Sequence, residues 1–359
     1  ECMQCEGVSP DAVTFICILK ACGTIGALGM GKKIHEKVIQ NGLLDKDIIV
    51  GNALVDMYAK CGVLSKAHQV LEELPIRDIV SWNALIAGYA QLGQCREALD
   101  CLDWMQMEGL KPNSVTFVSI IKACGSNGAI DKGMEVHDEI ITRGLLATDI
   151  VFGNALVDMY AKCGVLSKAL QVLDEIPMRD TVSWSALIAG YAQQGRGLEA
   201  LCCFQWMESE GFSPDKITFL CVLNACNHSG LLDQAQMLFW NMSKEYGISP
   251  TIEHCTCMVA VFGNSGHWDK AKFVIKSMPS SDSPAVWLAL LDACKKWGNV
   301  KLGKLAFYHL VKLDHSCPTA YVLMINIFAA AGMQEDVEKI RAMKLKFSDN
   351  LAGRNKEMV

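Results

Sequence analysis

The feature that most constrains this chain is a tract of 17 residues, GNALVDMYAKCGVLSKA, which occurs without a mismatch at Gly51–Ala67 and again at Gly153–Ala169. Around the tract, residues 48–78 and 150–180 agree at 25 of 31 positions, at an offset of 102 residues. Repeats of this length are typical of helical hairpins that stack on one another, because a single hairpin cannot bury its apolar face alone. The chain is therefore expected to be a repeat array.

Apolar residues within each repeat follow helical spacing. In the first copy of the tract, Leu54, Met57 and Tyr58 lie at i, i+3 and i+4, and a second stripe starts at Leu64 and ends before Pro75. No segment alternates apolar and polar residues over several strand lengths, so no sheet is expected. The predicted fold is all-α, a right-handed α-solenoid superhelix of stacked helical hairpins.

Composition agrees with this fold. Apolar residues make up 51% of the chain and charged residues 20%, and no apolar run reaches the roughly 18 residues of a membrane span. Of the 17 cysteines, Cys22, Cys124 and Cys226 recur at the 102-residue offset. Thiols at matched repeat positions indicate small apolar spacers in a reducing compartment, not a disulfide framework.

Three motifs identify the type of repeat. They are VSWNALIAGYAQ with a later GLKPN in residues 80–113, NALVDMYAKCG with a later PxRD, and VTFVSIIKACGSNGAIDKGMEVH in residues 115–137. With these motifs the chain resembles the plant pentatricopeptide repeat (PPR) proteins, of the subclass that alternates pure, long and short repeats (PLS). The residues after the repeats resemble the E-type extension motifs of organellar RNA-editing factors.

This resemblance implies a division of the chain. Residues 1–11 are expected to be the tail of a truncated upstream repeat, residues 284–352 two E-type extension hairpins, and residues 353–359 a C-terminal tail. The eight repeats between them are 12–47, 48–78, 79–113, 114–149, 150–180, 181–215, 216–251 and 252–283, in long, short, pure order. Any targeting peptide would lie upstream of these residues, so its absence from them says nothing about the compartment.

Repeats of this family read single-stranded RNA with one base per repeat, through two or three side chains. The resemblance places the main readers at the fifth and the last residue of a repeat. An amide at the fifth position carries a donor and an acceptor and suits pyrimidines, whereas Ser or Thr there is associated with purines. The implied assignments are Asn52 with Asp78 for U, Asn83 with Asn113 for C over U, Asn154 with Asp180 for U and Ser185 with Asp215 for G, with Thr256 a reader of unassigned preference.

Other positions have contrasting interpretations. The long repeats carry Ile16, Val118 and Leu220 at the fifth position and are expected to read weakly, because an aliphatic side chain makes no hydrogen bond to a base edge. Branched aliphatic residues at the second position are implied to sandwich the bases, but spacing alone favours a place in the core. Asn and Asp near helix starts could simply be caps. The candidate base-sandwiching residues are Ile49, Val80, Val115, Val151, Val182 and Ile217.

Lys60 and Lys162 occupy the slot in which the family places a contact to the RNA backbone phosphate. A lysine at this place, just before a helix stop, equally suits the helix dipole. The net charge of −6 gives no overall attraction for RNA. Binding is therefore expected to depend on local contacts.

No catalytic residue, cofactor or metal is expected, and the chain is predicted not to be an enzyme. A deaminase needs His-x-Glu together with Pro-Cys-x-x-Cys. His137-Asp138-Glu139 matches the first half by letter, but the equivalent His35 is followed by Glu36-Lys37, and no Pro-Cys-x-x-Cys occurs. Cys2 and Cys5 form an isolated pair near the amino end. A DYW deaminase domain is therefore expected to be absent.

The resemblance implies a site-recognition factor for organellar C-to-U RNA editing, in a mitochondrion or chloroplast, with the deaminase supplied in trans. Expected partners are single-stranded organellar RNA, a DYW-type deaminase protein and multiple organellar RNA editing factors, with no membrane and no DNA. One alternative is an RNA-binding factor for transcript splicing, stability or translation. Another, from a different class, is a protein-binding helical scaffold, which the acidic charge favours.

Overall fold

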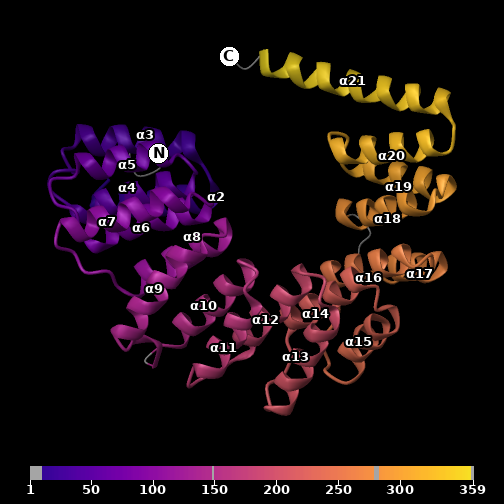
Figure 1. Cartoon of the computed structure of the whole chain (residues 1–359). Helices are drawn as coiled ribbons and strands as arrows, with labels where there is room; N and C mark the ends of the chain where they lie inside the picture. The colour runs from indigo at the N-terminus through magenta and orange to yellow at the C-terminus, as the bar shows by residue number, and fades with distance from the viewer. Residues whose placement is uncertain (1–9, 148, 279–282, 357–359) are drawn as a thin grey trace. The chain divides into compact units, whose positions relative to one another are not determined.

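The computed structural model describes residues 10–147, 149–278 and 283–356, with side chains described as far as residue 345. Within these ranges it is all-helical, with 20 α-helices, one short 3-10 helix and no strand (Figure 1). Among the described residues, no helix is both long and apolar enough to cross a membrane. The chain divides into two compact units, residues 1–179 and 180–359, and each is described by itself.

Unit 1 consists of hairpins, each with a first and a second helix. A 3-10 helix, η1 (Leu145–Ala147), follows the fourth hairpin. The hairpins are α2 (Ala12–Ile25) with α3 (Leu28–Gln40), α4 (Ile48–Lys60) with α5 (Leu64–Glu73), α6 (Ile79–Gln91) with α7 (Cys95–Met107), α8 (Ser114–Asn127) with α9 (Ile130–Thr142) and α10 (Ile150–Lys162) with α11 (Leu166–Glu175).

Unit 2 continues the same pattern. Its hairpins are α12 (Thr181–Gln193) with α13 (Gly197–Ser209), α14 (Lys216–Ser229) with α15 (Leu232–Lys244), α16 (Ile252–Asn264) with α17 (Trp268–Ser277), α18 (Pro284–Trp297) with α19 (Val300–Leu313) and α20 (Pro318–Ala330) with α21 (Gln334–Lys356).

The first helices start where the repeats are predicted to start. From α2 to α18 each begins on the first residue of its predicted repeat or extension hairpin. The first helix of the second extension hairpin, α20, begins at Pro318, within the predicted range of 284–352. Helix α21 extends to Lys356, so residues 353–356 continue a helix and do not form a separate tail. Residues 1–9 of the predicted tail at 1–11, with the cysteine pair, and residues 279–282 lie outside the described residues.

Capping explains why the first helices begin where they do. The side chain of Asp78 accepts hydrogen bonds from the backbone N–H groups of Val80 and Ser81, and the Ser81 hydroxyl accepts one from the Asp78 N–H in return. This capping box satisfies donors that have no partner inside the helix. Glycines mark the carboxyl ends of the first helices. In the preceding hairpin, α4 is followed by Gly62 with φ 76°, a left-handed conformation that favours glycine.

Packing of the first helices builds the core. In unit 1, consecutive first helices from α2 to α10 pack side by side, and each second helix packs on the first helix of its own hairpin (Figure 1). Leu54, Met57 and Tyr58 of α4 are fully or almost fully buried, as the apolar spacing predicts. In unit 2, α12, α14, α16, α18 and α20 pack in the same succession. The structure thus confirms an all-α array of helical hairpins.

The recurring cysteines are core residues. Cys22, Cys124 and Cys226 have exposed fractions of 3%, 0% and 0%. Burial raises the pKa of the Cys124 and Cys226 thiols to about 12, so both are protonated near neutral pH. The described cysteines are all free thiols. Their burial fits the predicted role of small apolar spacers.

Because two histidines are buried, the folded chain is expected to lose stability in mild acid. His35 and His137 are 5% and 2% exposed, and their Nδ1 atoms lie 2.9 Å from the hydroxyls of Tyr58 and Tyr160. Burial, with a smaller effect from Lys66 and Lys168 respectively, lowers the pKa of each below the ordinary 6.5. Since the unfolded chain binds these protons more readily, stability is present above pH 6.5 and decreases as pH falls below it.

The melting temperature of the wild type is therefore expected to be lower at pH 5.5 than at pH 7.5. A His35→Gln, His137→Gln double variant, measured by circular dichroism at both values, should show a smaller difference. Some difference should remain, because burial also lowers the pKa of His254. An undiminished difference in the double variant would contradict the prediction.

Candidate nucleic-acid interface

The pair Asn52 and Asp78 joins two successive first helices of unit 1. Asn52 is not a helix cap, because it lies on the second turn of α4, whose cap is Asp47. Asn52 is 9% exposed. Its Nδ2 lies 3.1 and 3.2 Å from the two carboxylate oxygens of Asp78, the cap of α6. The fifth and the last residue of one repeat are therefore in direct contact, and the last residue caps the next helix as well.

A second pair repeats this geometry with one difference. Asn83, 8% exposed on α6, donates through Nδ2 to Oδ1 of Asn113 at 3.1 Å, and Asn113 caps α8. The hydroxyl of Thr116 donates to Oδ1 of Asn83 at 2.6 Å. Both polar atoms of the Asn83 amide therefore have a protein partner.

In unit 2, Ser185 lies on α12 with an exposed fraction of 6%. Its Oγ is 2.8 Å from Oγ1 of Thr218, and the Thr218 hydroxyl donates to the carboxylate of Asp215 at 2.9 Å. Asp215 caps α14. Here the fifth and the last residue are linked through the third residue of the following repeat.

The remaining predicted readers have other surroundings. Asn154 is half-buried on α10 in unit 1, and Asp180 is the cap of α12 in unit 2. Thr256 is half-buried on α16, and its hydroxyl donates to the backbone oxygen of Ile252 at 2.8 Å. A hydroxyl engaged by its own helix is a weaker candidate for reading a base. The fifth residues of the long repeats are all half-buried.

Aliphatic side chains at the second position are exposed, so the expectation from spacing that they belong to the core is wrong. Their location at the start of the first helices leaves them outside the helix-to-helix contacts. Sequence reasoning missed Val13, which is 64% exposed at the second position of α2 and could have been found by extending the same register. The exposed fractions are 58% for Ile49, 54% for Val80, 56% for Val115, 47% for Val151, 58% for Val182 and 63% for Ile217.

The two predicted phosphate contacts are lysines paired with an acidic neighbour. Nζ of Lys60 lies 2.7 Å from Oδ2 of Asp56, and Nζ of Lys162 lies 2.6 Å from Oδ2 of Asp158. The lysine side chains remain 48% and 40% exposed. Each is the last residue of its first helix, where the carboxyl end of the helix also favours a positive charge.

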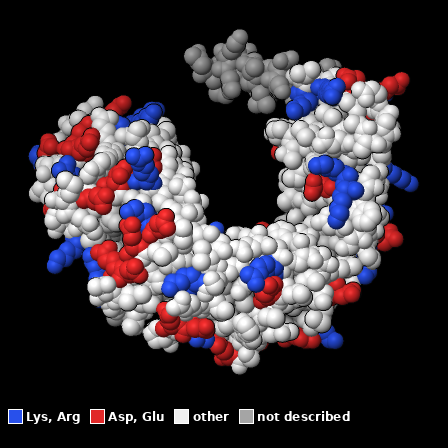
Figure 2. Space-filling model, in the orientation of Figure 1, with Lys and Arg blue, Asp and Glu red and all other residues white. Residues whose placement is uncertain are grey.

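Charge is sparse on the first helices. The visible face of the molecule shows acidic and basic side chains intermixed over α9, α11 and α13 (Figure 2). A low density of carboxylates limits repulsion of a polyanion along the first helices. In the ten first helices the charged residues are Lys20, Lys60, Lys122, Lys162, Lys216, Lys295 and Lys296 against Asp56, Asp158, Glu253 and Asp292.

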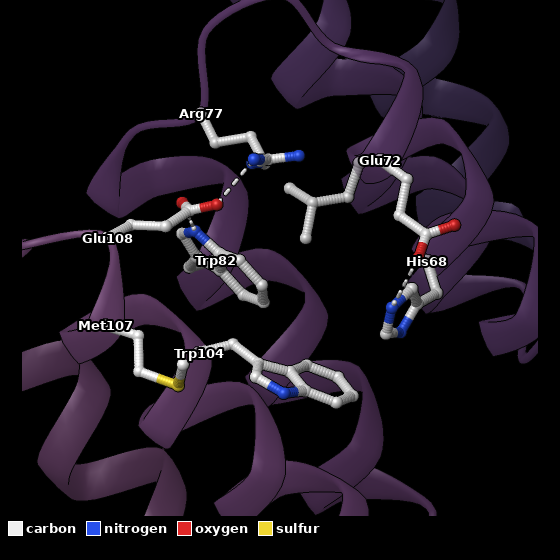
Figure 3. Close-up of a pocket in the computed structure, with 8 residues that line it drawn as sticks. His68, Glu72, Arg77, Trp82, Trp104, Met107 and Glu108 are labelled. Carbon is white, nitrogen blue, oxygen red and sulfur yellow. Dashed lines mark hydrogen bonds and ion pairs between the residues drawn. The ribbon is translucent and has the colours of Figure 1, made fainter.

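A pocket of about 300 Å³ lies between α5, α6 and α7 of unit 1 (Figure 3). Glu108 occupies one wall, where one carboxylate oxygen accepts the Trp82 indole N–H at 2.8 Å and the other lies 2.6 Å from Arg77. Trp104 and His68 form the opposite wall, with ring centroids 5.3 Å apart. Because Glu108 binds both Arg77 and Trp82, the polar groups of this pocket hold the hairpin together.

The histidine of the His-x-Glu match is a core residue of the repeat. His137 is buried against Tyr160, as expected for a scaffold residue. No group of three or more His, Cys, Asp or Glu side chains that could hold a metal ion occurs among the described residues. The geometry instead brings together hydrogen-bonding side chains and exposed aliphatic residues, a combination suited to binding planar polar groups.

Family models match most of the array. The model described as PPR repeat family matches residues 77–126 and 179–228, and the E motif model matches residues 297–350. The model described as PPR repeat matches residues 52–79, 115–145, 154–180, 217–246 and 253–283. Together the two repeat models cover more than half of the chain.

Curated relatives from Arabidopsis thaliana are similar over nearly the whole chain. The pentatricopeptide repeat-containing protein At4g38010 is 39% identical over 96% of this chain and 62% of its own length. The proteins At1g08070, chloroplastic, and At3g13770, mitochondrial, are each 38% identical, over 95% and 96% of this chain and 46% and 55% of their own lengths. The chain thus spans about half the length of the curated relatives it matches.

A solved structure shares the fold. The pentatricopeptide repeat protein PPR10, crystallised with an 18-nt psaJ RNA element, superposes with a TM-score of 0.68 and 18% identity over 97% of this chain and 52% of PPR10. Both are helical-repeat solenoids. With its matched repeats followed by an E motif, the chain belongs to the pentatricopeptide repeat family.

Proposed function

We propose that this chain binds single-stranded RNA in a sequence-specific manner, with the first helices facing the RNA and one base read per repeat. The observation that supports this most is the recurring arrangement at the start of the first helices. There a buried reader, such as Asn52 or Asn83, contacts the capping residue of the next helix, beside an exposed aliphatic side chain. Exposed apolar walls could stack on a base while the buried polar group selects its edge.

Charge does not oppose this proposal locally, although the net charge is −6. The carboxylates on the first helices are few, and two of the four are paired with Lys60 and Lys162. A phosphate could share these lysines with Asp56 and Asp158. Affinity would then depend more on stacking and hydrogen bonding than on counterion release.

The footprint follows from the order of the repeats. With the amino end of the protein toward the 5′ end of the RNA, we expect 5′-U, C or U, any, U, G, any, any, for the repeats from 48–78 to 252–283. The long repeats contribute no hydrogen bond, because Val118 and Leu220 are aliphatic. Thr256 remains unassigned, since its hydroxyl is engaged by the Ile252 backbone oxygen.

The role we propose for this binding is site recognition in organellar C-to-U editing, in a mitochondrion or a chloroplast, with the deaminase acting in trans. The E motif supports the editing role, and the chloroplastic and mitochondrial names among the relatives support the location. Knockout should then abolish one C-to-U event. A factor for splicing, stability or translation would instead alter transcript processing with editing intact.

Helix α19 offers a surface for the proposed protein partners, a DYW-type deaminase and organellar editing factors. Leu305 and Tyr308 are 47% and 64% exposed. The helix carries Lys301, Lys304 and Lys312 and no acidic residue. An exposed apolar patch with basic residues beside it suits a partner surface that is apolar and acidic.

Base preference can be measured by gel shift with a short RNA that carries the U-C-n-U-G-n-n footprint. A second probe has G in place of both uridines, and a third has U in place of the G opposite Ser185. The wild type should bind the first probe more tightly, and a Ser185→Asn variant should change its preference opposite that residue from G toward U. Equal binding to the first two probes would refute the base assignments, and no binding to any probe would favour a protein-binding scaffold.

Stacking can be tested by shortening the two exposed aliphatic side chains at the second positions that flank the reader Asn83. A Val80→Ala, Val115→Ala double variant should lose roughly tenfold in RNA affinity, because each apolar carbon that a base covers contributes up to about 0.8 kcal/mol. Both valines are more than half exposed, so the melting temperature should hardly change. The matched control is Met107→Ala on the second helix α7, where the methionine is 83% exposed. Equal affinities in all three proteins would contradict the sandwich.

Phosphate contact predicts a change in salt dependence. Replacing Lys60 and Lys162 with Gln should reduce the slope of log K against log salt by about 1.4, since each contact to a single strand contributes about 0.7. Lys132→Gln is the control, because Lys132 is also exposed and paired, with Glu135 at 2.7 Å, but lies on the second helix α9. A slope that changes by the same amount per removed charge in Lys132→Gln as in the double variant would mean that the effect is one of overall charge.

A further inference from the structure

The readers of the two pure repeats contact a residue that the base-reading assignment leaves out. This residue is the third of the following long repeat, Thr116 beside Asn83 and Thr218 beside Ser185. Both threonines have an exposed fraction of 0%. A hydroxyl has one proton to donate, so the partner that receives it decides what the neighbouring reader has left to offer a base.

At Asn83 the threonine supplies the proton. Oγ1 of Thr116 lies 2.6 Å from Oδ1 of Asn83 and 3.1 Å from Oδ1 of Asn113, so the stronger bond is the one to Asn83. The Asn83 oxygen thereby already accepts one strong hydrogen bond and is a weaker acceptor for a base, and one amide hydrogen is given to Asn113. What remains for a ligand is the second N–H of Asn83, a hydrogen-bond donor.

Asn52 has the opposite character. The third residue of the next repeat is Ser81, and its hydroxyl donates to the backbone oxygen of Asp78 at 2.8 Å instead of reaching Asn52. The Asn52 amide nitrogen is held by the Asp78 carboxylate, and Oδ1 is buried without a hydrogen-bond partner among the described residues. A buried carbonyl of this kind is stabilised by any ligand that brings an N–H donor.

Ser185 also presents an acceptor, by a different route. Thr218 gives its only proton to the Asp215 carboxylate, since a carboxylate can only accept. The Ser185 hydroxyl therefore donates to Oγ1 of Thr218 across the 2.8 Å contact. The lone pairs of the Ser185 oxygen are left for the ligand.

We propose that Thr116 and Thr218 are positioning residues that set whether the adjacent reader acts as a donor or an acceptor toward its base. This rests on the proposed RNA binding. Position 3 of cytosine is an acceptor and position 3 of uracil a donor, while position 1 is a donor in guanine and an acceptor in adenine. The donor at Asn83 then selects C, the acceptor at Asn52 selects U, and the acceptor at Ser185 selects G over A.

The test is a set of gel-shift titrations with probes that differ only in the base opposite Asn83. The wild type should prefer C over U by roughly five- to tenfold, the size expected of one hydrogen bond. Thr116→Val removes the hydroxyl, frees the Asn83 oxygen and should bring the C-to-U ratio close to one or below it. Thr116→Ser keeps a hydroxyl and should keep the preference for C. The preference for U opposite Asn52 should be the same in all three proteins.

Two further variants test the proposal at other repeats and guard against misfolding of Thr116→Val. Thr218→Val should leave the Ser185 proton free to donate, so that A is accepted opposite Ser185 as well as G. Ser81→Thr adds the methyl group that restricts rotation about χ1 and should direct the hydroxyl toward Asn52, which moves its preference from U toward C. Circular dichroism identifies any variant that does not fold.

The outcomes separate the two proposals. If the wild type binds none of the probes, the proposed function fails. If the wild type prefers C opposite Asn83 and Thr116→Val has the same preference, RNA binding stands and the positioning role of Thr116 is refuted. A wild type that binds without distinguishing C from U opposite Asn83 refutes the positioning role as well, because the donor character of Asn83 then has no effect.

Discussion

The rest of the structure depends on the burial of one first helix against the next. Within each unit these helices form a continuous row, and residues such as Leu54, Met57 and Tyr58 are buried only because a neighbouring repeat covers them. The row fixes the spacing of the helix starts. Every potential reader of a base is placed by this packing, so recognition and stability share the same contacts.

Helix capping is the second interaction on which the candidate site depends. Asp78, Asn113 and Asp215 satisfy the free N–H groups of the helix that follows them, and the first two also contact the fifth residue of the helix before. The alternatives of cap and base reader are therefore compatible. A side chain held by its capping bonds has a defined orientation, and binding then costs less conformational entropy.

Binding of RNA by an acidic chain requires that attraction be local. The structure offers three conditions for it: exposed aliphatic walls, few carboxylates on the first helices and lysines at their carboxyl ends. Exposing a valine such as Val80 costs free energy in water, and a stacked base would remove that cost. The second helices carry most of the other charges.

The sequence by itself determined the all-α class, the register of the repeats and the candidate pairs, because helical spacing, polar caps and Gly stops are local signals that recur along the repeats. Tertiary structure decided what these signals leave open. Whether Val80 is core or surface depends on where the neighbouring helix lies, and the pairing of Lys60 with Asp56 depends on side-chain rotamers. The hydroxyl that donates to the Asn83 oxygen belongs to a residue 33 positions away, Thr116. Hydrogen bonds between successive helices recur at the repeat offset, but spacing alone does not say which side chains meet, so only the packed structure shows the partners.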